Sequence, residues 1–167
     1  MHQPVPPSLD DLLARFPHEG RIEWIGARPA RRAPLRVLDA AEITEAGIDG
    51  DHRGRPGKRA VTLIQAEHLP AIAAMLRRER IDPALLRRNI VVSGINLMAL
   101  RKRTFSIGTA VLCGTGPCAP CSRMEEALGP GGYNAVRGHG GITAEVLAPG
   151  RIAVHDQIVA QNSGNSD

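Results

Sequence analysis

Aromatic residues are scarce in this sequence of 167 residues, since phenylalanine, tryptophan and tyrosine together make up 2% of it. They are Phe16, Trp24, Phe105 and Tyr133. Apolar residues reach 43% of the chain, so the core has to be built mainly from leucine, isoleucine, valine and alanine. Proteins that stack nucleic acid bases need exposed aromatic side chains, so we expect no nucleic acid partner.

Long apolar runs are also missing. No stretch approaches the roughly 18 consecutive apolar residues of a membrane-spanning helix, so we expect no membrane association. Residues 1–13 lack the charged start and apolar run of a secretory signal peptide. A GxGxxG fingerprint is missing too, which disfavours a dinucleotide-binding domain. We therefore expect a cytoplasmic protein whose three cysteines are reduced.

Lysine is nearly absent, because Lys58 and Lys102 are the only two, and the net charge of +4 comes from arginine. The planar guanidinium group suits phosphate and carboxylate ligands. The arginines are dispersed along the chain and form no basic tail. Two interpretations stay open: an arginine-rich composition without function, or a few arginines that converge on an anionic ligand.

The hydrophobic pattern predicts many short strands and few helices. We expect strands at residues 21–26, 35–43, 60–64, 90–92, 97–100, 104–107, 109–113, 142–147 and 157–160, with a hairpin around 148–151. We expect helices at residues 9–16, 66–80 and 122–128. Short strands separated by glycines are typical of a β-barrel or a compact mixed-β domain. We expect an N-terminal arm over residues 1–20, one domain over 21–160 and a disordered tail over 161–167.

The segment 116–124 carries the clearest chemistry. Prolines bracket Cys118 and Cys121, and Cys121 falls where the predicted helix 122–128 begins. A helix N-terminus and the charge of Arg123 both favour the thiolate, which attacks electrophiles and ligates metals. Cys121 is therefore the predicted catalytic residue, the alternative being an inert buried cysteine.

The other two cysteines have weaker cases. Cys118 is either a resolving thiol for Cys121, as C-x-x-C spacing allows, or a residue that packs the loop. Cys113 alternates within a strand and is predicted to be core. A zinc site made from the three cysteines and His139 is conceivable by count, although the spacing lacks a second C-x-x-C.

Four more candidates lie in loops or at element ends. Asp51 is either an acid or base beside the cysteine or a turn carboxylate that accepts backbone N–H groups. Arg59 points into the site or pairs with Asp51. His139, between two glycines, lies in a loop open to ligand approach or in a plain turn. Arg123 is either a partner of an anion or of the thiolate, or a solvated helix residue.

Several motifs follow one another in a recognisable order. They are Gly50-Asp51-His52, the segment 59–64, Leu86-Arg87-Arg88-Asn89 with the strand 90–94, the segment 107–112, Pro120-Cys121-Ser122-Arg123-Met124, a Gly-Gly turn and a closing strand beside Asp156. The series resembles the MOSC domain, the C-terminal module of molybdenum cofactor sulfurases that also occurs alone in bacteria. The resemblance covers roughly residues 20–160.

The resemblance implies a mainly β fold, a β-barrel of the MOSC or pyruvate-kinase-barrel-like type, with two or three short α-helices. It implies that Cys121 ligates molybdenum together with the sulfurs of the molybdopterin dithiolene. Arg87 and Asn89 match the segment that lies near the pterin phosphate in cofactor-binding relatives. With them we group the cofactor-binding candidates Arg123, Arg59 and His139.

Three functions remain as hypotheses. The first is a molybdenum-dependent oxidoreductase that reduces N-hydroxylated small molecules and receives electrons from a reductase partner. The second is a sulfur carrier that accepts sulfur from a cysteine desulfurase as a persulfide on Cys121. The third is a non-enzymatic pterin- or anion-binding module.

Two departures from the family pattern are His155-Asp156 in place of Gly-Asp and the lack of a separate N-terminal barrel to cover the pterin. Exposed strand edges suggest a homodimer.

Overall fold

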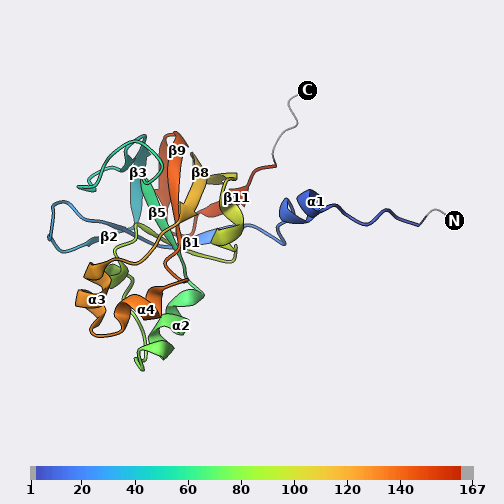
Figure 1. The fold of residues 1–167 in the computed structure, drawn as a ribbon. Coiled ribbons are helices and arrows are strands. Elements are labelled where there is room, and N and C mark those ends of the chain that lie inside the picture. Colours follow the sequence, from blue (N-terminus) through green and yellow to red (C-terminus); the bar gives the residue numbers. More distant parts are fainter. Residues whose placement is uncertain (1–2, 163–167) are drawn as a thin grey trace.

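A closed barrel of seven strands forms the body of the protein (Figure 1). The computed structural model describes residues 3–162. In order around the barrel the strands are β1 (Gly20–Ala27), β11 (Gln157–Ala160), β7 (Thr104–Ile107), β8 (Ala110–Pro117), β9 (Ile142–Ala148), β5 (Val61–Gln65) and β6 (Ile90–Ser93), which pairs again with β1. β5 and β6 run parallel. The predicted mainly β barrel fold is confirmed.

A small second sheet lies beside the barrel. It consists of β10 (Gly150–Ala153), β3 (Ala40–Thr44) and β4 (Gly47–Ile48), while β2 (Arg36–Leu38) extends the barrel sheet at β1. Two predictions about this region are wrong. The stretch 35–43 forms two strands in different sheets, and β10 pairs with β3 instead of forming a hairpin with β9.

Side chains from every second residue of the strands fill the barrel. In β8, Ala110, Leu112 and Gly114 are buried, whereas Val111 and Cys113 are half-buried on the outward face. The prediction of Cys113 as a core residue is therefore wrong, because its parity in the strand puts it on the face opposite to Leu112. Phe105, in β7, is the largest side chain in the buried core.

Short helices gather at one end of the barrel (Figure 1). They are α2 (His68–Met75), the 3₁₀ helix η1 (Pro83–Leu86), α3 (Ser122–Leu128) and α4 (Gly132–Val136). Their apolar residues pack with Ile64 and Val91 into a second buried cluster on the outer side of β5 and β6. Those two strands are thus buried on both faces, which explains their continuous apolar sequence.

Three helical segments differ from the pattern-based expectation. α2 stops at Met75, and Arg77 adopts a left-handed φ of 52°, so residues 77–80 lie beyond the helix. Residues 97–100, expected as a strand, form the 3₁₀ helix η2 (Leu97–Leu100), whose start is capped by the Asn96 side chain. The sequence pattern does not predict α4, because the helix begins in a glycine-rich stretch. The Glu125 carboxylate stabilises its start by accepting hydrogen bonds from the backbone N–H groups of Gly131, the N-cap, and Tyr133.

Residues 3–13 extend away from the barrel (Figure 1). α1 (Leu9–Leu13) begins at Ser8, whose side chain forms a capping box with Asp11. The tail predicted over 161–167 lies, beyond residue 162, outside the described residues. Within residues 3–162 no helix has the length and apolar character needed to cross a membrane.

Candidate functional site

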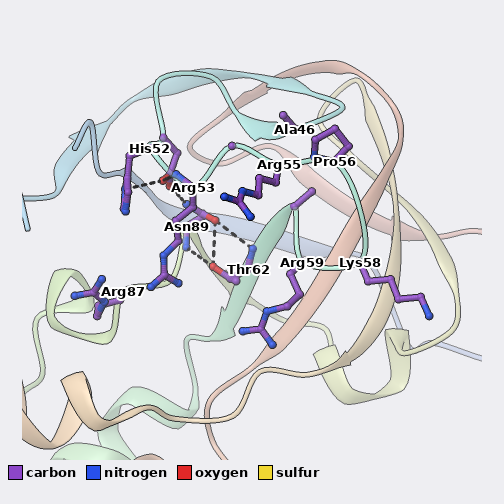
Figure 2. A pocket seen from close by; sticks show the side chains of 13 residues that line it. Ala46, His52, Arg53, Arg55, Pro56, Lys58, Arg59, Thr62, Arg87 and Asn89 are labelled. Atoms are coloured by element: carbon purple, nitrogen blue, oxygen red, sulfur yellow. Dashed lines mark hydrogen bonds and ion pairs between the residues drawn. The ribbon is translucent and has the colours of Figure 1, made fainter. Parts of the chain in front are cut away.

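A pocket of about 640 Å³ opens between the loop that connects β4 to β5 and the junction of η1 with β6 (Figure 2). The loop, residues 49–60, is rich in glycine and arginine. The residues that line the pocket are Ala46, Asp51, His52, Arg53, Gly54, Arg55, Pro56, Lys58, Arg59, Ala60, Thr62, Arg87 and Asn89. The predicted residues Asp51, Arg59, Arg87 and Asn89, distant in sequence, therefore share one pocket.

Asn89 forms the floor of this pocket through bonds to three segments. Its Oδ1 accepts hydrogen bonds from the Thr62 backbone N–H at 3.2 Å and from the Thr62 hydroxyl at 3.1 Å (Figure 2). Its Nδ2 donates to the Gly26 carbonyl at 3.3 Å and to Asp51 Oδ2 at 2.6 Å. All donors and acceptors of the amide are thus occupied, so Asn89 shapes the pocket rather than offering a free polar atom.

Asp51 holds the turn of the loop. Besides the bond from Asn89, its Oδ1 accepts from the Arg53 backbone N–H at 3.1 Å and lies 3.5 Å from His52 Nδ1. His52 Nδ1 in turn lies 3.0 Å from the Arg28 carbonyl oxygen. The turn interpretation thus has direct support in the geometry, and a catalytic role for Asp51 stays a prediction.

Five cationic side chains line the pocket without ionic partners. They are Arg53, Arg55, Lys58, Arg59 and Arg87, and Arg59 and Arg87 lie on opposite sides of the Asn89 floor (Figure 2). In the described part of the chain, no carboxylate oxygen lies within 4.0 Å of any of these five groups. The pairing of Arg59 with Asp51 that the sequence left open is therefore not formed. Such a cluster attracts anionic ligands.

Arg87 is the most constrained of the five. It caps η1 in a left-handed conformation with φ of 59°. Its Nε is buried and has no hydrogen-bond partner among residues 3–162. Burial lowers the pKa of Arg87, as do the nearby charges of Arg28, Arg53 and Arg123, whereas Cys121 opposes them. An anion bound here would satisfy the Nε–H group and offset the repulsion between the arginines.

The two cysteines of the predicted motif lie in different environments. Cys121 is exposed at the N-cap of α3, and its side chain makes no capping hydrogen bond. Cys118 is buried with 3% exposure, and its backbone N–H donates to the Gly141 carbonyl at 2.8 Å. The alternative that Cys121 is a buried cysteine is thus wrong. Cys118 is buried, as expected if it packs the loop.

Sequence reasoning missed Arg88, which lies directly behind the cysteines. This side chain is 5% exposed, and its guanidinium donates to four backbone carbonyl oxygens. Burial lowers the pKa of Arg88, while Cys118 and Cys121 act in the opposite direction. No local pattern marked Arg88, because it lies between η1 and β6, outside both elements, where neither helical nor strand periodicity applies.

His139 lies outside the pocket lining. Its ring meets that of His68, the first residue of α2, edge to face, with ring centroids 4.8 Å apart. Its Nδ1 is buried without a hydrogen-bond partner in the described chain. Within residues 3–162 no three histidine, cysteine or acidic side chains are grouped closely enough to hold a metal ion, so the zinc ligand set is not assembled.

The contact between the two histidines predicts a stability change with pH. Burial lowers the pKa of His68, the neighbouring His139 lowers it further, and Glu67 opposes them. The unfolded state then binds more protons, so this contribution to stability is present above the ordinary histidine range and is lost as pH falls. We expect the melting temperature to decrease as pH falls from about 7 to 5, and His68→Phe to flatten that decrease. An equally steep decrease in His68→Phe would contradict this assignment.

Comparison with known proteins agrees with the barrel geometry. A model of the MOSC domain family matches residues 49–159, a span that holds every pocket residue except Ala46, as well as Arg88, Cys118 and Cys121. A sequence comparison with functionally curated proteins finds no match.

Solved structures share the fold. The YuaD protein from Bacillus subtilis is similar with a TM-score of 0.76 at 20% identity, covering 87% of this chain and 98% of that chain. YiiM from Geobacillus stearothermophilus has a TM-score of 0.72 at 17% identity, with 88% and 77% covered. YiiM from Escherichia coli has a TM-score of 0.67 at 19% identity, with 85% and 70% covered.

Proposed function

Because the chain belongs to the MOSC domain family, we propose that its cationic pocket binds the molybdenum cofactor and that the Cys121 thiolate ligates the molybdenum. The observation that carries this proposal is a pocket lined by arginines without ionic partners, together with an exposed thiol, Cys121, that does not line the pocket but whose charge acts on Arg87. We propose a molybdenum-dependent reductase of N-hydroxylated small molecules as the activity.

The residues present fit such a group. The phosphate of a pterin cofactor needs guanidinium donors, and Arg87 has a buried Nε–H group that lacks an acceptor. A thiolate is a soft ligand that suits a metal already bound by sulfur. The pocket volume of about 640 Å³ lies in the range of small-molecule and cofactor sites.

Each part of the chain has a distinct role in this proposal. Arg87, with Arg53 and Arg59, would hold the anionic end of the ligand, and Asn89 would keep the floor in place. The loop 49–60 would form one wall, and the exposed Cys121 would hold the metal at the surface, where a substrate can reach it. When bound, the cofactor supplies oxygen-atom transfer chemistry. A reductase partner would supply the electrons.

The first test is the molybdenum content of protein purified without oxygen from cells that make the cofactor. We expect close to one molybdenum per chain in the native protein and a loss of at least about tenfold in Cys121→Ala, since thiolate ligation anchors the metal. Cys113→Ala is the matched control, because Cys113 lies on the outward face of β8, and it should retain the metal. Absence of molybdenum and pterin from the native protein would contradict the proposal.

Sulfur transport is the second candidate, and the exposure of Cys121 favours it, because a protein donor must reach the thiol. The Cys121 thiolate would attack the outer sulfur of a desulfurase persulfide. The donor's S–S bond would break, leaving a persulfide on Cys121 and a thiolate on the donor. A persulfide on Cys121 in molybdenum-free protein would favour this function, whereas bound cofactor without turnover would favour a binding module.

A further inference from the structure

We infer that Arg88 is the positioning residue of this site and that it fixes the cysteine loop, residues 118–121, against the body of the protein. The inference rests on the proposed function only in taking Cys121 as the functional thiol. Arg88 does not line the pocket, so it acts through the loop and not on a ligand.

The guanidinium joins three segments that are distant in sequence. Its Nη2 donates to the carbonyl oxygens of Cys118 and Ala119, each at 3.1 Å. Its Nε donates to the Gly140 carbonyl at 2.8 Å, and its Nη1 donates to the Leu86 carbonyl at 3.2 Å. One side chain therefore fastens the cysteine loop to η1 and to the turn before β9.

Two further contacts show how closely these segments are packed. The Cys118 backbone N–H donates to the Gly141 carbonyl at 2.8 Å. A Cβ atom at Gly140 would overlap the Cys118 carbonyl oxygen, so only glycine fits beside the loop. The cysteine loop thus occupies the space beside Gly140 that a side chain there would fill, and the Arg88 guanidinium binds both the loop and Gly140.

The chemistry of the side chain explains why arginine is needed. Four buried carbonyl oxygens in three directions require several donors in a planar fork, which guanidinium provides. A lysine ammonium concentrates its donors at one point and cannot reach all four acceptors. An apolar residue would leave the carbonyls unpaired, which is costly inside a protein.

The Cys121 backbone is held by α3, because its carbonyl oxygen accepts from the backbone N–H of buried Met124 at 2.9 Å, whereas the thiol itself is not held. Its side chain is exposed and makes no capping bond, and α3 has only seven residues. Within the loop, only Pro120 separates Cys121 from Ala119, whose carbonyl is bound by Arg88. The position of Cys121 therefore depends on α3, which begins there, and on how firmly residues 118 and 119 are held.

The test is alkylation of each cysteine by iodoacetamide in metal-free protein, followed by peptide mass spectrometry. Cys118 is buried, so native protein should protect it. We expect Arg88→Met to raise the labelling rate of Cys118 at least about tenfold well below the melting temperature, because the loop opens locally. Arg88→Lys keeps the charge without the fork and should also raise it.

Arg78→Met is the matched control. Arg78 donates to the Leu128 carbonyl at 2.6 Å, so the variant removes an arginine–carbonyl bond from the other end of α3. It should leave Cys118 protected. Native protection in a folded Arg88→Met protein, or in Arg88→Lys, would overturn the inference; if Arg88→Met does not fold, Arg88→Lys decides.

Molybdenum content, measured separately, distinguishes this inference from the proposed function. Native protein without molybdenum, but with the expected labelling pattern, would contradict the cofactor proposal and leave the role of Arg88 standing. Native labelling and native molybdenum content in Arg88→Met would contradict the role of Arg88 and leave the cofactor proposal standing. If both hold, Arg88→Met should lose molybdenum while Arg78→Met retains it.

Discussion

Gly141→Ala is expected to destabilise the folded state severely. Gly141 has φ of 82°, and a Cβ atom there would overlap the Leu63 carbonyl oxygen in β5. Relief would require β5 to move away from β9, where Leu63 pairs with Ile142, and would break the closed barrel. We expect a loss of more than about 4 kcal/mol in the free energy of unfolding, measured by urea denaturation.

Gly138→Ala is the matched control for this prediction. Gly138 has nearly the same conformation, with φ of 84°, but a Cβ atom there meets no heavy atom within 4 Å. The variant should therefore pay only the left-handed strain of about 1–2 kcal/mol. Similar losses in the two variants would show that backbone strain alone, and not the contact with Leu63, limits position 141.

Asn89→Ala is the prediction with the second largest effect. The substitution removes four hydrogen bonds at once and leaves the Thr62 N–H and the Gly26 carbonyl without their side-chain partner. It also frees the Asp51 carboxylate from the floor of the pocket. We expect a loss of about 2–4 kcal/mol in the free energy of unfolding, since buried polar groups left unpaired are costly.

The control for Asn89→Ala is Asn134→Ala, because Asn134 is exposed on α4. A surface substitution of this kind should change stability by no more than about 0.5 kcal/mol. Asn89→Asp adds a sharper comparison, because it keeps the shape and the acceptors but loses the two donors and faces Asp51. At neutral pH it should be at least as destabilising as Asn89→Ala, because it brings two carboxyl groups face to face. Equal stability of Asn89→Asp and native protein at neutral pH would contradict the role of the donors.

Different residues of the site support its structure and offer donors to a ligand. Asn89 and Arg88, whose hydrogen bonds go to the protein itself, hold the floor and the cysteine loop. Arg87 and the arginines of the loop 49–60 keep free donors that face the pocket. A base fixed by hydrogen bonds, with cationic side chains that keep free donors above it, is the pattern expected of a site that binds an anionic group in one orientation.

The sequence by itself determined the fold class and most of the strands. Alternating apolar residues place strands such as β7 and β11 directly, because a strand that is buried on one face requires that period. Local chemistry also placed the start of α3 at Cys121. The ordered motifs identified the family and brought Arg87 and Asn89 into the candidate site.

Only the tertiary structure decided which neighbouring residues do which task. Arg87 and Arg88 are adjacent and chemically identical, yet one lines the pocket and the other is buried behind the cysteines. Cys118 and Cys121 share a motif, yet one is buried and the other exposed. The burial of Arg88 depends on the carbonyl groups of residues 118, 119 and 140, which are far from it in sequence, and no local pattern records which backbone groups a fold brings together.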